Sequence, residues 1–361
     1  NSNHSASLLA ASKGLLSAVS INAVFECVKQ TGWPSYQTQT YETASAGAGV
    51  IYSLDKTTGD AYIITNYHVI YNSASSASNK ISNRITVYLY GMEYADYAIP
   101  AIYVGGSMNY DIAVLKVSGN QILKTGSARE AEFADSNDVS VLQTAIAIGN
   151  PEGEGISATV GAVNVDSENI TMVAADGVSE VTMRVMRIDA AVNGGNSGGG
   201  LFDDEGKVIG IVNAKITSST IDNIGYAIPS NIAKAVADNI IYYDNINAAN
   251  DGVYRVLLGI NVSISDSCSV FDEQTGKVHK VETVIVGSIN EGSIVKNILA
   301  VNDVINSITV DGKTYKITRT FTVVDAMLNA RQTSAVIINV TSGGVTKDVS
   351  LDLSNVTPTL W

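Results

Sequence analysis

The chain has 361 residues, of which 45% are hydrophobic and 16% charged, and its formal net charge is −13. This is the composition of a globular protein with room for two or three domains. The acidic balance argues against nucleic acid and anionic membrane surfaces as partners, because both require clustered Lys and Arg. The three histidines, His4, His68 and His279, and the two cysteines, Cys27 and Cys268, match no metal-ligand spacing, so no metal or other cofactor is expected.

The first elements in the chain are a short amphipathic helix over residues 5–18 and a strand over residues 18–28. The apolar stretch from Leu8 to Val28 is interrupted by polar and charged side chains, so it does not read as a membrane-spanning helix. We expect Cys27 and Cys268 to be buried free thiols, with a disulfide between them as the alternative.

Short runs rich in Val, Ile, Thr and Tyr follow, separated by turn signals rich in Gly, Asp and Asn. We expect strands over residues 47–53, 61–66, 84–89, 99–104, 111–117, 144–148, 157–165, 181–188, 199–202 and 208–214. Their spacing leaves no room for the helices that a parallel sheet requires, so the pattern predicts antiparallel β-barrels. Polar loops are expected over residues 73–83 and 167–179, and the second is long enough to suggest a functional role.

The pattern changes at Pro229 and Ser230. Ser230 can cap a helix in which Ile232, Val236 and Ile240 recur at helical spacing. Residues 245–252 are polar and read as a linker. Strands return from Val253 onward, with a short helix over residues 293–298 and a longer one over 322–330, which together predict a separate α/β module of about a hundred residues.

A glycine-rich bend surrounds Ser197. Gly194 and Gly195 precede it and three glycines follow it, and glycine permits the tight backbone that exposes a serine hydroxyl and frees neighbouring N–H groups. A nucleophilic serine needs a base, and the base needs an orienting acid. His68 is the candidate base because the other histidines lie near the terminus and in the second module, and Asp111, at the head of an apolar strand, is the candidate acid.

The order His68, Asp111, Ser197 resembles that of the trypsin-like serine proteases. The matching stretches are Thr65–Val69, Asp111–Leu115 and Gly195–Gly199, and Ile148–Pro151, Asp189–Asn193 and Gly225–Asn231 resemble the HtrA (DegP-like) branch of that family. The resemblance covers roughly residues 15–235. It implies two six-stranded antiparallel β-barrels, with the three residues in the cleft between them.

The same resemblance implies a serine endopeptidase in which Ser197 attacks the substrate, His68 moves the proton and Asp111 orients His68. It places the oxyanion hole at Gly195, Asn196 and Ser197, and the specificity pocket at Ala191, Val192, Asn193, Asn213, Ala214 and Lys215. A carboxylate six residues before the nucleophile selects Lys or Arg in trypsin-like enzymes, and this chain has Ala191 there. Cleavage after small or medium aliphatic residues is therefore expected.

Beyond the linker, the chain resembles a PDZ domain. The residues Leu257, Leu258, Gly259 and Ile260 look like the loop that binds a peptide carboxylate, and Gly287–Ile289, Ser293–Leu299 and Asn302–Ile305 look like later turns and strands. Met327 and Leu328 either line the peptide pocket or belong to the core face of their helix. The implied partners are polypeptides with a free, apolar C-terminal residue.

These observations predict a mainly β protein with four parts. Residues 1–20 form an N-terminal segment, residues 21–230 a trypsin-like protease domain, residues 231–252 a helix and linker, and residues 253–361 a smaller α/β PDZ-like domain. The family resemblance implies that the N-terminal segment could build a homotrimer. The implied substrates are unfolded or damaged extracytoplasmic proteins, and any signal or anchor segment would lie outside this chain. The alternative is a catalytically weak, chaperone-like peptide-binding protein.

Overall fold

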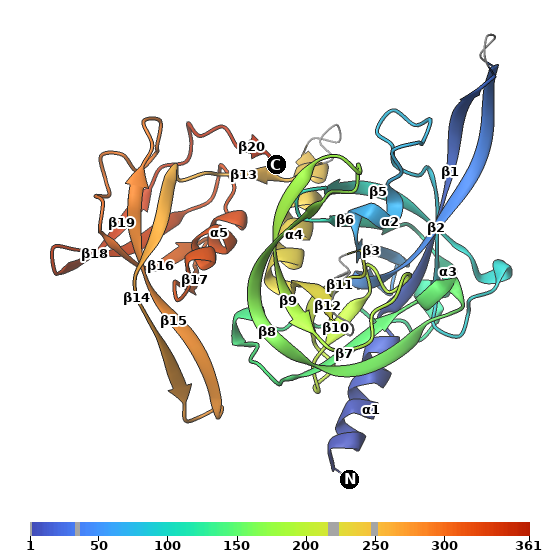
Figure 1. Ribbon diagram of the computed structural model, residues 1–361, viewed down its shortest axis with the longest axis horizontal. Helices are drawn as coiled ribbons and strands as arrows, with labels where there is room; N and C mark the ends of the chain where they lie inside the picture. Colours follow the sequence, from blue (N-terminus) through green and yellow to red (C-terminus); the bar gives the residue numbers. More distant parts are fainter. Residues whose placement is uncertain (1, 33–36, 216–223, 247–251) are drawn as a thin grey trace. The chain divides into compact units, whose positions relative to one another are not determined.

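The computed structural model describes residues 2–32, 37–215, 224–246 and 252–361. The chain divides into two compact units, Asn1–Asp251 and Gly252–Trp361 (Figure 1). None of the helices in the described ranges is long and apolar enough to cross a membrane.

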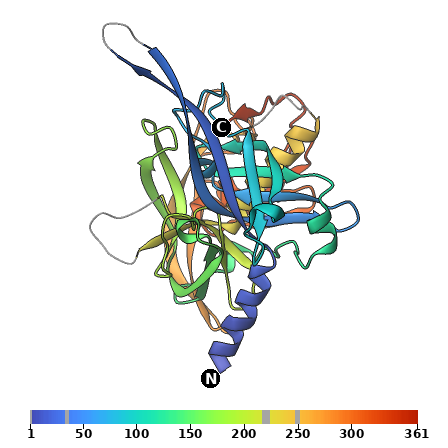
Figure 2. The ribbon, with the colours of Figure 1, turned by 90° about the vertical axis from the view of Figure 1, so that its right-hand side faces the viewer.

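Six strands of the first unit close into a barrel in the order β1-β2-β3-β6-β5-β4. They are β1 (Ala18–Thr31), β2 (Gln37–Asp55), β3 (Asp60–Thr65), β4 (Arg84–Leu89), β5 (Ile99–Ser107) and β6 (Ile112–Val117). All neighbours are antiparallel, and inward side chains such as Ile21, Phe25 and Leu115 fill the barrel. The β1–β2 hairpin extends well beyond the other strands (Figure 2).

A second closed barrel follows in the order β10-β11-β12-β9-β8-β7. Its strands are β7 (Thr144–Gly149), β8 (Ser157–Val173), β9 (Glu180–Ile188), β10 (Gly200–Phe202), β11 (Val208–Asn213) and β12 (Gly225–Pro229). Met186, Leu201 and Val212 lie in its core. The prediction of two six-stranded antiparallel barrels is thus confirmed.

Short helices connect these strands, and two longer helices pack outside them. The helices are α1 (Ser2–Leu15), α2 (Tyr67–Ile70), α3 (Gln121–Thr125) and α4 (Ser230–Ile246), with 3-10 turns η1 (Ala95–Tyr97), η2 (Ser136–Asp138) and η3 (Pro151–Gly153). Helix α4 packs on β5 and β6 of one barrel and on β11 of the other.

A polar cluster fixes α4 to the first barrel. The Tyr52 hydroxyl donates to Asp238, while the Lys234 ammonium lies 2.9 Å from the Tyr52 oxygen and 2.7 Å from the Asp238 carboxylate. Burial, together with the Asp238 charge, raises the pKa of Tyr52 to about 12. The hydroxyl therefore stays protonated and keeps its donor at any physiological pH.

The second unit is a sheet covered by one helix. Strands β14 (Ile260–Asp272), β15 (Lys277–Ile289), β16 (Val304–Val310), β18 (Val336–Ser342) and β19 (Val345–Leu351) pair in that order, and β17 (Lys313–Lys316) pairs with β16. Helix α5 (Thr320–Leu328) supplies Ala326 and Met327 to the core. The short strands β13 (Tyr254–Arg255) and β20 (Thr359–Leu360) form a separate pair.

Three local predictions are corrected by the structure. Residues 167–173 are not loop but continue β8, pairing with β9 through Thr171 and Thr182, and only residues 174–179 form the turn. Residues 293–298 form successive turns instead of a helix. The Ser293 carbonyl, for example, accepts from the N–H of Lys296, three residues later, which is the bonding pattern of a turn. Cys27 is buried and free as predicted, but Cys268, also free, is exposed on the β14–β15 hairpin.

Candidate active site

Strand pairing brings His68 and Asp111 together. Strands β3 and β6 are antiparallel neighbours with Thr65 opposite Ala113, so the end of β3 and the start of β6 meet at one end of the barrel. His68 lies in α2, directly after β3, and Asp111 stands just before β6 with φ 48°. Aspartate tolerates this left-handed conformation better than most side chains, and here it turns the chain into the strand.

A continuous chain of hydrogen bonds joins the three predicted catalytic residues. His68 Nδ1 lies 2.6 Å from Asp111 Oδ2, and His68 Nε2 lies 2.9 Å from Ser197 Oγ. The His68 backbone N–H also donates to Asp111 Oδ1 at 2.9 Å. The side chains of Asp111 and His68 are only 6% and 17% exposed. This geometry lets the imidazole accept the serine proton while the carboxylate holds the other ring nitrogen.

Two asparagines that sequence reasoning did not assign to the acid hold Asp111 in place. Asn213 Nδ2 donates to Asp111 Oδ2 at 2.8 Å, so this residue, predicted to line the specificity pocket, directs its buried side chain at the acid instead. Asn66 Nδ2 donates to the Asp111 carbonyl at 2.9 Å. Neither contact follows from sequence spacing, since each depends on where a strand end points its side chain.

The bend around Ser197 requires glycine at two positions. The Asn196 N–H donates to the Asn193 carbonyl at 3.0 Å, closing a turn whose third residue, Gly195, has φ 93°. Gly198 has φ 84°, and a Cβ there would lie 2.3 Å from the Ala48 carbonyl oxygen. A positive φ favours glycine at both positions, and Gly198 in addition has no room for a side chain, which explains the glycines on both sides of the serine.

The N–H groups of Gly195 and Ser197 donate to no acceptor within the described ranges, whereas their carbonyls are both used. The Asn150 N–H donates to the Gly195 carbonyl at 3.2 Å and the Ala48 N–H to the Ser197 carbonyl at 2.8 Å. Asn196 instead uses its N–H within the bend, and its side chain approaches the Ala191 carbonyl at 3.5 Å. Among the described residues, the bend thus leaves two N–H donors, one of them on the serine itself, without an acceptor.

The remaining predicted pocket residues surround this bend. Val192 is half-buried and packs against Gly225, where a Cβ would lie 2.8 Å from Val192 Cγ2, while Ala191 and Asn193 are exposed. The Ala214 N–H donates to Ser197 Oγ at 3.1 Å. The wall expected from the sequence also includes Ile216, which lies outside the described residues.

Lys215 reaches away from the serine. Its ammonium donates to the Ala174 carbonyl in the β8–β9 turn at 2.6 Å. Burial lowers the pKa of Lys215, although the nearby carboxylates of Asp111 and Asp176 favour its charged form. The side chain therefore ties the active-site strand end to that turn.

In the second unit, the predicted carboxylate loop precedes β14. Leu258 is buried and Leu257 is exposed. Gly259 has φ 72°, and Ser293 Oγ donates to the Leu258 carbonyl at 2.7 Å, so the turn after β15 supports the loop. Ile260 opens β14, an edge of the described sheet. Of the two alternatives for Met327 and Leu328, the burial of both favours the core.

Comparisons with known proteins agree with this architecture. Residues 47–211 match the model of the trypsin-like peptidase domain. The serine protease Do-like HtrA of Bacillus subtilis (strain 168) is 36% identical over 211 residues, covering 58% of this chain and 42% of that protein. The serine protease Do-like HtrA of Lactococcus lactis subsp. lactis (strain IL1403) is 33% identical over 267 residues, covering 72% of this chain and 59% of that protein. The chain thus spans about half the length of the curated relatives it matches.

A solved structure of the HtrA-type protease AlgW with a decapeptide has the same fold. It superposes with a TM-score of 0.53 at 22% identity, and the match covers 98% of each chain. The likeness therefore extends over both units and not only over the barrels.

Proposed function

Because this chain is an HtrA/DegP-like protein with a trypsin-like peptidase domain, we propose that it is a serine endopeptidase with Ser197, His68 and Asp111 as its catalytic residues. The observation that carries the proposal is the unbroken line of hydrogen bonds from Ser197 Oγ through His68 to the buried Asp111 carboxylate. Both donor–acceptor distances are short enough for the proton transfer and the hydrogen bond that the reaction requires.

In the proposed reaction, Ser197 Oγ attacks the scissile carbonyl carbon while His68 Nε2 accepts the hydroxyl proton. Asp111 holds the Nδ1 proton and stabilises the imidazolium that forms. His68 then donates its proton to the leaving amine, which breaks the C–N bond and leaves an acyl-enzyme. A water molecule, deprotonated by the same imidazole, hydrolyses this ester and restores Ser197.

The negative charge that develops on the carbonyl oxygen needs donors. We assign these to the N–H groups of Gly195 and Ser197, which are left without acceptors by the described residues. The sequence also places Asn196 in the oxyanion hole, but its N–H instead closes the bend by donating to the Asn193 carbonyl. Donors fixed in advance in this way stabilise the transition state without reorganisation during the reaction.

The alternative function, a catalytically weak chaperone-like peptide-binding protein, needs none of this geometry. A degenerate protein has no reason to keep a buried acid, a base and a hydroxyl in register, nor two N–H groups in the same bend that the described residues leave without an acceptor. The hydrogen-bonded geometry therefore favours the endopeptidase.

The proposed specificity is for small or medium aliphatic residues before the cleaved bond. Ala191 supplies no carboxylate, and the packing of Val192 against Gly225 makes one wall apolar. Burying a Lys or Arg side chain without a partner costs several kcal/mol, whereas one methylene changes discrimination by only about 1–3 kcal/mol. We therefore expect cleavage after Val, Ala, Ile or Leu with modest preferences among them.

We further propose that the second unit binds peptide C-termini beside β14. Gly259 in the predicted loop has φ 72°, a left-handed conformation that favours glycine. Strand β14 is an edge strand of the described sheet, to which an extended peptide can add. Amidation of a bound peptide should abolish binding, because the loop N–H groups recognise a carboxylate. Unfolded extracytoplasmic proteins as substrates, and a homotrimer built through residues 1–20, are proposed from the family resemblance.

The proposal is tested by Ser197→Ala, with Ser73→Ala on the exposed loop after α2 as the matched control. Ser197→Ala should lower casein cleavage by on the order of 10⁴-fold or more while peptide binding by the second unit persists. Ser73→Ala should cleave at the wild-type rate. Wild-type cleavage by the Ser197→Ala protein would refute the assignment.

A further inference from the structure

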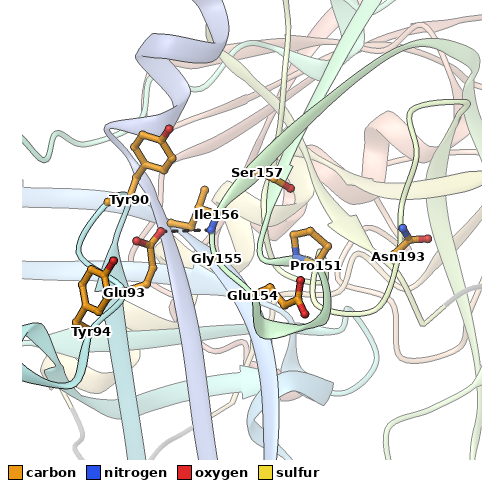
Figure 3. A pocket seen from close by; sticks show the side chains of 10 residues that line it. Tyr90, Glu93, Tyr94, Pro151, Glu154, Gly155, Ile156, Ser157 and Asn193 are labelled. Carbon is orange, nitrogen blue, oxygen red and sulfur yellow. Dashed lines mark hydrogen bonds between the residues drawn. The ribbon is translucent and has the colours of Figure 1, made fainter.

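A pocket of about 610 Å³ opens between the two barrels of the first unit (Figure 3). The segment after β4 supplies Tyr90, Glu93 and Tyr94 to one wall, and the segment between β7 and β8 supplies Pro151 and Glu154 to the other. Neither the hydrolytic mechanism nor the specificity pocket uses these side chains.

Hydrogen bonding and charge give the pocket a defined character. Glu93 Oε1 accepts from the Ile156 N–H at 3.3 Å, which joins the two walls. The Glu154 carboxylate has no polar partner in the parts of the chain that the structure describes. Tyr90 and Tyr94 are 52% and 69% exposed, so their rings are accessible from solvent. No lysine or arginine is among the described residues that line the pocket.

The pocket is continuous with the catalytic bend. Asn193 lines it, and the Asn193 carbonyl accepts the Asn196 N–H that closes the turn before Ser197. Asn150, at the start of the β7–β8 segment, donates to the Gly195 carbonyl at 3.2 Å. The segment that forms one wall is therefore bonded directly to the oxyanion loop.

Two residues beside the serine do not line the pocket. The Ala214 N–H donates to Ser197 Oγ at 3.1 Å, and Lys215 follows Ala214 in the chain. A substrate that lies with the residues before its scissile bond along Ala214 and Lys215 extends the residues after that bond toward the pocket.

We infer that this pocket is a substrate subsite for an arginine or lysine side chain that follows the scissile bond, an inference that rests on the proposed endopeptidase function. Tyrosine faces attract a cation, and a planar guanidinium can stack on a ring while its N–H groups bond a carboxylate. Glu93 and Glu154 supply carboxylates from both walls without an internal cation to neutralise them. The enzyme thus combines an apolar requirement before the cut with a basic preference after it.

The test uses quenched fluorogenic peptides with Val before the scissile bond and Arg, Gln or Glu at each of the first four positions after it. At one of these positions kcat/KM should rank Arg, then Gln, then Glu, with about a tenfold advantage of Arg over Gln at low salt. Added salt should reduce that advantage, because the carboxylates are accessible to solvent.

Variants then assign the preference to the pocket. Glu93→Gln and Glu154→Gln, alone and combined, should bring the Arg-to-Gln ratio toward one. Glu154→Lys combined with Glu93→Gln should reverse the order of the Arg and Glu peptides. Glu26→Gln, an exposed site on β1, is the control and should keep the wild-type ratio.

The outcomes separate this inference from the function beneath it. Equal cleavage of the Arg, Gln and Glu peptides at every position, or an Arg preference that survives the combined Glu93→Gln and Glu154→Gln variant, would overturn the subsite alone. Failure of the wild-type protein to cleave any peptide would overturn the endopeptidase and the subsite together.

Discussion

Replacing Asn213 by alanine tests whether its side chain supports Asp111, the proposed catalytic acid. The Asp111 carboxylate receives three hydrogen bonds, from the His68 N–H, from His68 Nδ1 and from Asn213 Nδ2 at 2.8 Å. Asn213→Ala removes the third and leaves a buried carboxylate with one donor fewer. A hydrogen bond to a charged group contributes about 1.5–3 kcal/mol.

The rate effect follows from that energy. If most of it is lost from the orientation of His68 in the transition state, kcat should fall by about 10- to 100-fold, since each 1.36 kcal/mol is a factor of ten. KM should change little, because the side chain faces Asp111 and not the substrate. Asn213→Ser, which keeps a donor, should recover part of the rate.

The assay is steady-state hydrolysis of a peptide with Val before the cut, using enzyme whose active-site concentration has been titrated. Thermal unfolding of each variant separates a local loss of orientation from a loss of fold. Wild-type kcat in a folded Asn213→Ala protein would show that this hydrogen bond does not support the triad.

Three further predictions concern other parts of the chain. Gly198→Ala should lower the melting temperature of the first unit measured by calorimetry, because its Cβ would lie 2.3 Å from the Ala48 oxygen at φ 84°; an unchanged melting temperature would contradict the described bend. Burial alone would raise the pKa of Glu282, but hydrogen bonds from Thr320 N–H and Lys280 and the charge of Arg319 outweigh it and hold that pKa below its ordinary value. The ionised Glu282 carboxylate therefore stabilises the second unit above the ordinary carboxyl pH range, and this contribution is lost as the pH falls through its pKa in the folded protein. Glu282→Gln should make the free energy of unfolding depend less on pH in acid unfolding curves. Mass-spectrometric mapping of cuts in an unfolded protein should show cleavage after aliphatic residues, and predominant cleavage after Lys or Arg would mean that a carboxylate reaches the pocket at Ala191.

The barrels could be predicted because their strands alternate or bury both faces, as in β3 and β11. The extension of β8 past Val165 could not be predicted, because every side chain of residues 166–173 is at least partly exposed, so neither face of this stretch is buried. The long hairpin formed by β14 and β15 could not be predicted for a similar reason. Cys268 and Phe271 are exposed there although both side chains are apolar.

The hydrogen-bonded grouping of His68, Asp111 and Ser197 could be predicted because the chain offers so few histidines, and because an acid and a serine stand in the expected order. The hydrogen bonds from Asn66 and Asn213 to Asp111 could not be predicted, because the direction of a side chain at a strand end depends on the register of the strand and on the neighbouring barrel. The pocket lined by Tyr94 and Glu154 could not be predicted from the sequence either, because its walls come from segments of two different barrels.

The most direct test of the central claim is labelling with a fluorophosphonate probe, followed by mass spectrometry of the digested protein. An activated serine hydroxyl is required for the reaction, so the account predicts a single adduct on Ser197 that is lost in His68→Ala and retained in Ser73→Ala. Absence of labelling in the folded wild-type protein, or an adduct on another residue, would contradict it.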